Sequence, residues 1–324
     1  MINFEYTRTF SAKAAIDALA KNKSAQFIAG GTNLVDLMKK GVMAPQRLID
    51  INGLPLKDIK ADATGITIGA LVPNSTAAEN AAIKTNYPLL AMAINAGASA
   101  QLRNMATVGG NMMQRTRCPY FYDTTMPCNK RNPGSGCGAK NGYNRMHAIF
   151  GTSESCIAVH PSDMCVAMAA LNATVLVSGK KGNRKIVFTD FHRLPSTTPH
   201  IETNLQAGEL ITGVHIPKNN FNKSYYLKIR DRLSYAFALV SVAVGLEIKD
   251  EKVIKASLAM GGVAHKPWRL PAVEKFLVGK KITPEIIEQA AELGLQNAVT
   301  VEHNAYKVKL GKAAIKEAIT KAIA

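Results

Sequence analysis

Apolar residues in the first half of the chain recur at helical and at strand-like spacings in turn. Ser11 is a suitable N-cap for a helix whose apolar residues return every three or four positions. An alanine-rich stretch at 76–98 is also helical in its spacing and is interrupted by Pro88. Short apolar runs between turns predict strands at residues 26–29, 47–51 and 65–70. Helices and strands are therefore mixed along this half.

The second half begins with a helical spacing at 161–171 and continues into strands. Strands are predicted at 174–177 and, as a pair, near 186–188 and 210–216. After Pro217 the composition changes, and three successive strands are predicted at 225–229, 238–248 and 253–260. Two helices follow, one capped by Thr283 and one over residues 313–324. We place a domain boundary near residue 217.

Residues 112–158, here called the cysteine segment, have no such periodicity and are rich in Gly, Pro, Asn, Arg and Cys. Irregular segments of this length inside compact domains are usually functional. The segment holds Cys118, Cys128, Cys137 and Cys156, whose gaps do not match the tight Cys-x-x-Cys pairs of a zinc knuckle. Four thiolates suit a 4Fe-4S cluster or a zinc ion, or they remain unligated, and the spacing leaves all three open.

The fifth cysteine and the histidines have a simpler interpretation. Cys165 lies in an apolar helical run, where a free cysteine behaves as a small buried hydrophobic residue. His160 is expected to be a hydrogen-bonding structural residue. An odd number of cysteines and a start without a basic stretch and apolar core predict neither a disulfide framework nor a secretory signal.

Composition narrows the class of protein further. The chain has 324 residues, of which 47% are hydrophobic and 19% charged, which excludes a disordered or fibrous protein. No apolar run approaches the length of a membrane-spanning helix. The formal net charge is +17, but the basic residues are dispersed. We therefore expect no nucleic-acid binding and assign the charge to an anionic cofactor and acidic partner surfaces.

Two glycine pairs follow predicted strand or helix ends. The first lies in Ala29-Gly30-Gly31-Thr32-Asn33-Leu34 and the second in Thr107-Val108-Gly109-Gly110-Asn111. Paired glycines let backbone N–H groups converge on phosphate oxygens, and two such turns suit the two phosphates of a dinucleotide. Taken singly, such a pair favours a simple tight turn. A Gly-x-Gly-x-x-Ala match at Gly134 has no strand before it and is attributed to chance.

These segments together resemble the FAD-binding medium subunits of the xanthine dehydrogenase and molybdenum hydroxylase family. The two glycine turns are similar to that family's two flavin loops. The segments from His160 to Ala173 and from Lys228 to Ala236 are similar to those that follow them. The resemblance implies an α+β fold with a two-lobed FAD-binding domain of the vanillyl-alcohol-oxidase/PCMH type at 1–217, its lobes at about 1–55 and 56–217. An α+β C-terminal domain would occupy 218–324.

The resemblance also implies a set of site residues, none of them catalytic in the sense of an acid or base. The residues expected to bind FAD are Ile28, Ala29, Gly30, Gly31, Thr32, Asn33, Leu34, Thr107, Gly109, Gly110, Asn111, Asp163, His215 and Lys228. Asp163 would contact the nucleotide, Lys228 would stabilise negative charge on the reduced flavin, and His215 would contact FAD through its backbone.

The cysteine segment departs from most of the family and resembles the branch whose flavin subunit carries an extra 4Fe-4S cluster. Within that branch the chain is most similar to the flavin subunits of bacterial periplasmic aldehyde oxidoreductases. The resemblance favours iron–sulfur over zinc, with Cys118, Cys128, Cys137 and Cys156 as ligands.

The resemblance implies one subunit of a heterotrimer. A large subunit would carry molybdenum cofactor and oxidise an aldehyde, and a small subunit would carry 2Fe-2S clusters. This chain would pass their electrons from FAD to an external acceptor. Periplasmic export with a signal-bearing partner is expected, with a cytoplasmic location as the alternative. Two other functions stay open, a zinc-stabilised non-catalytic binding module and a free-standing flavin reductase.

Overall fold

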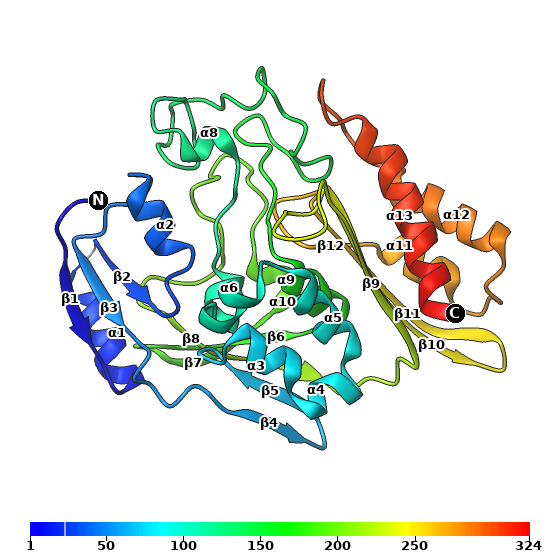
Figure 1. Ribbon diagram of the computed structural model, residues 1–324, viewed down its shortest axis with the longest axis horizontal. Coiled ribbons are helices and arrows are strands. Elements are labelled where there is room, and N and C mark those ends of the chain that lie inside the picture. Colours follow the sequence, from blue (N-terminus) through cyan, green and yellow to red (C-terminus); the bar gives the residue numbers. More distant parts are fainter. Residues whose placement is uncertain (23) are drawn as a thin grey trace.

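The computed structural model describes residues 1–22 and 24–324 and holds three β-sheets side by side along its longest axis (Figure 1). The N-terminal sheet is parallel, with the order β1-β3-β2. Its elements are β1 (Glu5–Arg8), α1 (Ala12–Ala20), β2 (Ala25–Ile28), α2 (Leu34–Lys39) and β3 (Arg47–Asp50). The Ser11 hydroxyl accepts a hydrogen bond from the Ala14 N–H, so the predicted cap of α1 is confirmed.

The central sheet has five antiparallel strands in the order β4-β5-β8-β6-β7. They are β4 (Ile59–Asp62), β5 (Gly65–Gly69), β6 (Thr174–Gly179), β7 (Gly182–Val187) and β8 (Leu210–Pro217). The prediction that β7 and β8 pair with each other is wrong, because β6 lies between them and pairs with both. Non-local pairing of this kind leaves no trace in the spacing of apolar residues.

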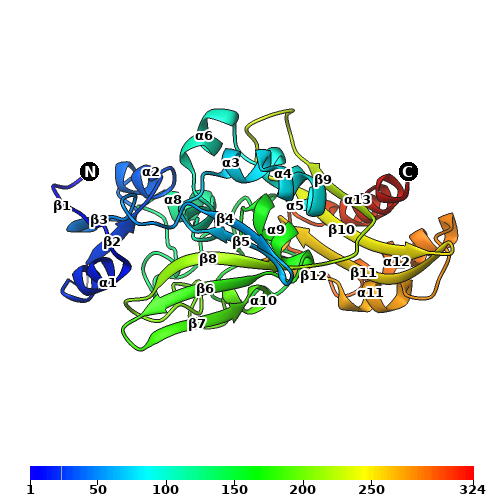
Figure 2. The same cartoon turned by 90° about the horizontal axis from the view of Figure 1, so that it is seen from below.

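Short helices cover one face of the central sheet (Figure 2). They are α3 (Asn74–Glu79), α4 (Ala81–Asn86), α5 (Pro88–Ala96), α7 (Val108–Met112), α9 (Asp163–Ala170) and α10 (Phe188–Phe191). Helix α6 (Ala100–Met105) has no buried residue and packs on α3. Pro88 does not simply interrupt a helix but occupies the first turn of α5, where its missing N–H is not needed. Every residue of α9 is buried, because this helix packs against the central sheet on one side and the C-terminal sheet on the other.

The C-terminal sheet is antiparallel with the order β12-β11-β10-β9, and helices cover one of its faces (Figure 1). Its elements are β9 (Lys223–Ile229), β10 (Val240–Lys249), β11 (Lys252–Gly261), β12 (Trp268–Arg269), α11 (Pro271–Leu277), α12 (Pro284–Leu295) and α13 (Tyr306–Ile323). The predicted last helix begins seven residues too late, since lysines mask the apolar spacing in the first turns of α13. The mixture of helices and antiparallel sheets confirms the predicted α+β class.

The cysteine segment beyond Met112 contains a single short helix in the described chain, α8 (Pro119–Tyr122), as its lack of periodicity predicts. It contacts two parts of the molecule. Phe121 and Cys128 pack with Leu37 of α2, and Ile149 and Phe150 enter the core of the C-terminal sheet. The segment therefore connects the N-terminal lobe to the C-terminal region.

The sequence predicts no membrane-spanning helix, and the helices of the structure can be compared with that prediction. Across residues 1–22 and 24–324, the structure has no helix that combines the length and the apolar character needed to cross a bilayer.

Candidate functional site

The first glycine loop, residues 28–34, connects β2 to α2 in a half-buried position. Gly31 has a φ of 72°, a backbone conformation that favours glycine. In the described part of the chain, the backbone N–H groups of residues 30–33 donate to no protein acceptor, and the buried Nδ2 of Asn33 has no partner either. Unpaired donors gathered in a half-buried loop are the observation that fits an anionic group such as a pyrophosphate.

Gly30 brings this loop into contact with the chain just before the second glycine loop, residues 107–111. A Cβ on Gly30 would lie 1.8 Å from the Met105 carbonyl oxygen, so only glycine permits the approach. The carboxamide of Asn33 strengthens the junction, because its Oδ1 accepts a hydrogen bond of 2.9 Å from the Arg115 N–H. The structure thus brings together the two loops that the sequence singled out.

The second glycine loop is the first turn of α7 rather than an open phosphate cradle. Thr107 caps it, and its Oγ1 accepts from the Gly110 N–H at 3.2 Å. The Gly109 N–H donates to the Ala70 carbonyl oxygen and the Asn111 N–H to that of Thr107, both at 2.8 Å. The prediction that these N–H groups are free for phosphate is therefore wrong. What the loop offers is the exposed, side-chain-free face of Gly110, which a ligand can approach closely.

Asp163 and Lys228 lie together as a buried ion pair. The Lys228 Nζ is 2.8 Å from Asp163 Oδ2 and also donates to the Ala96 carbonyl oxygen at 3.0 Å. The Tyr226 hydroxyl donates to the other carboxylate oxygen, Oδ1, at 2.8 Å. Both Asp163 oxygens are thus partnered from β9, and the two predicted flavin contacts are held as one unit between α9 and the C-terminal sheet.

The structure places His215 apart from these groups. It lies on β8, in register with Thr67 of β5 and Thr174 of β6, and its Nδ1 is 3.1 Å from the Thr67 Oγ1. It lines neither of the two cavities described below. Of the predicted residues, His215 is the one that the fold does not bring to the others.

The four cysteines of the cysteine segment converge on one small cavity, here called the cysteine cavity. Cys128 and Cys137 face each other across an antiparallel bridge, and all five cysteines of the chain are free thiols. Burial raises the pKa of Cys118 to about 12, whereas a hydrogen bond with Cys156 lowers the pKa of Cys137. Residues separated by up to 38 positions thus form one thiol-lined site, and that is what a metal centre requires.

The basic residues near the four cysteines already have partners in the fold. The buried ammonium of Lys130 lies 2.8 Å from Glu202, and the Arg115 guanidinium lies 3.0 Å from the same carboxylate. Arg131 donates to the carbonyl oxygens of Tyr120 and Phe121 and so fixes α8. Glu202 already balances part of this positive charge, which the sequence does not indicate because Glu202 lies outside the cysteine segment.

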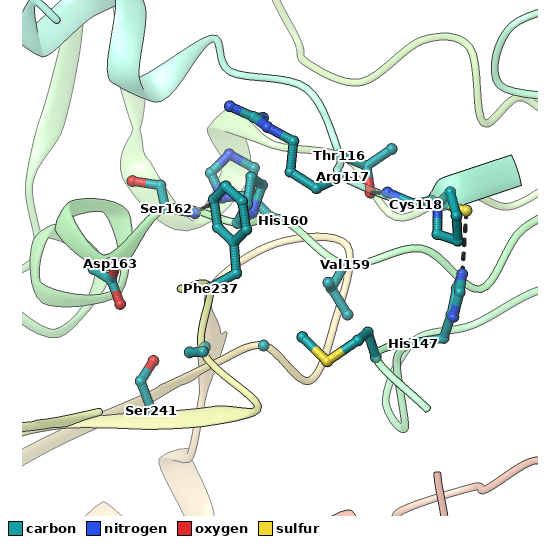
Figure 3. A pocket seen from close by; sticks show the side chains of 16 residues that line it. Thr116, Arg117, Cys118, His147, Val159, His160, Ser162, Asp163, Phe237 and Ser241 are labelled. Atoms are coloured by element: carbon teal, nitrogen blue, oxygen red, sulfur yellow. Dashed lines mark hydrogen bonds between the residues drawn. The ribbon is translucent and has the colours of Figure 1, made fainter. Parts of the chain in front are cut away.

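A larger cavity adjoins the cysteine cavity (Figure 3). Thr116 and Cys118 line both cavities, so these residues form a shared wall. Ser162 and Asp163 lie toward its other side, and Ser162 donates a hydrogen bond to Asn111 of the second glycine loop. The larger cavity therefore extends from the cysteine cavity to the neighbourhood of the glycine loops.

Arg117 and Phe237 also line the larger cavity, and the sequence did not single out either residue for it. The Arg117 guanidinium carbon lies 5.1 Å from the centre of the Phe237 ring, a cation–π geometry. Burial lowers the pKa of Arg117, which nevertheless stays protonated as arginines do. This places a half-buried positive charge beside the cavity, suitable for an anionic ligand.

His147 is a further contact that the sequence did not predict. Its Nε2 lies 3.1 Å from the Cys118 Sγ, and the pair stands in the wall between the two cavities (Figure 3). Burial, with the nearby charge of Lys307, lowers the pKa of His147 to about 4. The buried Lys307 Nζ donates to the His147 carbonyl oxygen at 2.9 Å. Lys307 lies on the apolar stripe of α13, and that position is the one sequence signal that marks it as buried.

His160 and His192 pack together behind the second glycine loop, with ring centres 4.1 Å apart. The His192 Nε2 is 2.8 Å from the Met112 carbonyl oxygen, at the end of α7. Cys165 is buried on α9, as expected, but its sulfur lies within 4.8 Å of a nitrogen of each ring. The structural role expected of His160 therefore extends to a small buried group that supports α7.

Family models divide the chain into two matched regions. Residues 2–219 match the FAD-binding domain in molybdopterin dehydrogenase. Residues 224–322 match the C-terminal domain of the carbon monoxide dehydrogenase flavoprotein. Together these regions include both glycine loops, the cysteine segment and the C-terminal sheet.

Individual relatives agree with the family models. The chain is 51% identical to the aldehyde oxidoreductase FAD-binding subunit PaoB of Escherichia coli K12, over 85% of this chain and 86% of that protein. It is 30% identical to the glyceraldehyde dehydrogenase medium chain of Sulfolobus acidocaldarius, over 89% of this chain and 85% of that protein. Among solved structures, quinoline 2-oxidoreductase from Pseudomonas putida 86 superposes with a TM-score of 0.77 at 25% identity, over 99% of this chain and 97% of that chain. Carbon monoxide dehydrogenase from Hydrogenophaga pseudoflava gives 0.79 at 23% identity, over 100% and 99%.

Proposed function

This chain belongs to the family of FAD-binding subunits of molybdopterin-dependent dehydrogenases, and from that membership we propose that it is the FAD- and 4Fe-4S-containing subunit of a molybdenum-dependent aldehyde oxidoreductase. The family assigns it FAD binding and an electron-transfer role. The convergence of four cysteines on one cavity, next to a glycine loop with unpaired donors, is the observation that carries the finer proposal.

The residues around the glycine loops fit FAD. The free N–H groups of residues 30–33 and the unpartnered Asn33 Nδ2 would bind the pyrophosphate, and Gly110 would allow close approach beside them. Asp163 would face the cofactor from the larger cavity, with Lys228 holding the carboxylate in place. FAD, when bound, exchanges electrons singly or in pairs and so connects one-electron centres to a two-electron acceptor. The side chains themselves bind and orient it, without a catalytic acid or base.

The resemblance of the cysteine segment to the branch with an extra 4Fe-4S cluster favours a cluster over a single zinc ion. All four thiols line one cavity, as the ligands of either centre would. A 4Fe-4S cluster, when bound, transfers single electrons, and each of its four thiolates binds a different iron.

We also propose the partners of this chain. The relatives are subunits by name, an FAD-binding subunit and medium chains, which supports assembly with a large molybdenum-cofactor subunit and a small 2Fe-2S subunit in a heterotrimer. Aldehyde oxidation would take place on the large subunit, and this chain would hold the exit path from FAD to an external acceptor. The formal charge of +17 suits acidic partner surfaces.

For location, we propose the periplasm, reached together with a signal-bearing partner. The support is the resemblance of the cysteine segment to that of periplasmic aldehyde oxidoreductases. Fractionation of cells that express the whole complex tests this directly. Recovery with periplasmic marker enzymes is the expected result, and recovery with cytoplasmic markers would support the alternative.

The decisive experiment is cofactor analysis of the complex purified without oxygen. Flavin, iron, acid-labile sulfide and zinc are quantified on one sample, and the visible spectrum is recorded. We expect one FAD, four iron atoms and four sulfides for each copy of this chain, in addition to the iron of the partners. Zinc in place of iron would make the cysteine cavity a structural zinc site. Oxidation of a nicotinamide cofactor by this chain alone would instead support a free-standing flavin reductase.

A further inference from the structure

The contact between His147 and Cys118 sets Cys118 apart from the other three cysteines. The His147 Nε2 lies 3.1 Å from the Cys118 sulfur, within hydrogen-bond distance for a sulfur acceptor (Figure 3). His147 is only 3% exposed, so water does not compete for this contact. Cys118 is also the one cysteine of the four that lines both cavities.

The hydrogen-bonding partners of His147 indicate which ring nitrogen carries the proton when Cys118 is a metal-bound thiolate. Within the described residues its buried Nδ1 has no partner, and Nε2 has only the Cys118 sulfur. A thiolate can only accept, so a proton on Nε2 is the arrangement that makes a hydrogen bond to it. His147 is therefore positioned to donate to the sulfur of Cys118.

The backbone of His147 is held rigidly, which keeps the ring in this position. Its carbonyl oxygen accepts from the Lys307 Nζ at 2.9 Å, and its N–H donates to the Asn144 carbonyl oxygen at 3.0 Å. Asn144 in turn accepts from the His303 N–H through its Oδ1 at 2.9 Å. The C-terminal region thus braces a donor aimed at one cysteine of the cavity.

We propose that His147 is a positioning residue that sets the reduction potential of the 4Fe-4S cluster through its hydrogen bond to the Cys118 thiolate. This inference rests on the proposed function, in which Cys118 is a cluster ligand. A donor to a ligating sulfur stabilises the more negative, reduced form of the cluster and so raises its potential. Cys118 lines both cavities. The sulfur that receives this hydrogen bond therefore faces the larger cavity and the glycine loops.

The test compares two variants in the whole complex. His147→Leu removes the donor, whereas His147→Gln keeps an N–H that reaches the position of Nε2. The midpoint potential of the cluster is measured by redox titration followed by electron paramagnetic resonance, and iron is quantified on the same samples. We expect a lower potential in His147→Leu and a potential close to that of the unmodified protein in His147→Gln. His200→Leu, at an exposed position that lines neither cavity, is the matched control.

An unchanged potential in His147→Leu, or an equal shift in both variants, would overturn the proposal. Pulsed electron paramagnetic resonance of the unmodified, reduced complex gives a second measurement that needs no variant. Labelling with ¹⁵N-histidine should change the coupling between the cluster and a histidine nitrogen. A spectrum without histidine nitrogen coupling would also overturn the proposal. If iron analysis finds no cluster in the unmodified chain, the proposed function itself fails, which is a different result from a cluster with an unshifted potential.

Discussion

Gly30 shows how the absence of one Cβ joins two segments that are distant in the chain. The Met105 carbonyl oxygen occupies the space that a side chain would need. The sequence marks Gly30 as part of a loop, because paired glycines between a strand and a helix are a local signal. It does not reveal Met105, because the close approach depends on the packing of α6 against the N-terminal lobe.

Substitution of Gly30 should therefore affect both stability and flavin retention. In Gly30→Ala, the new Cβ forces the first glycine loop away from Met105, at a cost of about 1–3 kcal/mol in the free energy of unfolding. We expect a several-fold loss of FAD on gel filtration of the complex. Gly279→Ala is the control: its φ of 80° carries backbone strain, but its Cβ would meet nothing within 4 Å, so it tests a glycine substitution without the clash at Met105. Equal flavin loss in both variants would show that the first glycine loop is not the site.

A second prediction distinguishes the cysteines proposed as cluster ligands from the cysteine that only packs in the core. Cys118→Ser should reduce the iron content of the chain by the four atoms of the cluster, because a serine hydroxyl is a poor iron ligand. Cys165→Ser should leave the iron unchanged, because Cys165 is buried on α9 and does not line the cysteine cavity. Iron and sulfide analysis of both proteins checks this. Equal loss in both would mean that the four ligands are wrongly assigned.

Much of the candidate site was predictable from single residues, and the failures have a common cause. The glycine loops and four cysteines carry their chemistry in their own type and neighbours. His147, Arg117 and Lys307 act through partners that only the fold brings close. The hydrogen bonds within the second glycine loop were also not predictable, since the acceptor for the Gly109 N–H is Ala70, which four helices separate from it in sequence.

Helices α7 and α10 are linked by one hydrogen bond that has a pH-dependent consequence. His192 directly follows α10, and its Nε2 contacts the carbonyl oxygen of Met112, the last residue of α7. Burial lowers the pKa of His192 from its ordinary value to about 4. The folded chain therefore binds fewer protons than the unfolded chain between pH 4 and about 6.5.

Stability should fall as the pH is lowered through that window, by at most about 1.4 kcal/mol per pH unit for this histidine. His192→Gln keeps an N–H donor toward Met112 but cannot be protonated. Between pH 6.5 and 5 we expect the variant to lose about 1–2 kcal/mol less than the unmodified chain, by urea unfolding. Parallel pH profiles for the two proteins would contradict this origin of the acid sensitivity.

Element boundaries followed the sequence where a cap or a clean apolar spacing was present, as at α1 and α12. They failed where side chains of mixed character share one face. The first turns of α13 carry several lysines, one of which, Lys307, is buried on the apolar stripe. Strand order could not be predicted at all, because β8 reaches its place between β5 and β6 through contacts distant in sequence.

The Asp163–Lys228 ion pair joins the two halves of the molecule. Asp163 begins α9, which belongs to the core of the central sheet, and Lys228 lies on β9 of the C-terminal sheet. Their charged groups are 2.8 Å apart with side chains that are 7% and 4% exposed. Removal of one partner would leave a buried charge without compensation, which is far more destabilising than loss of a surface pair.

Lys228→Met should accordingly lower the free energy of unfolding by about 3–5 kcal/mol, measured by urea unfolding of the flavin-free chain. The double variant Asp163→Asn/Lys228→Met removes both charges and should recover most of that loss. Lys281→Met breaks the exposed pair with Glu251 and serves as control, with an expected change below about 1 kcal/mol. A loss in Lys228→Met no larger than that of the control would show that the pair is not a joint between the halves.

The bracing of the cysteine segment by the C-terminal region also determines the order in which this protein can mature. The backbone N–H of His303 binds Asn144, which lies 159 positions earlier in the chain, and Lys307 binds the carbonyl group of His147 from 160 positions away. During translation the four cysteines are therefore synthesised long before the residues that fix the loop around them. A cluster at the proposed site would therefore be enclosed by contacts from His303 and α13 that form only after the whole chain has been made.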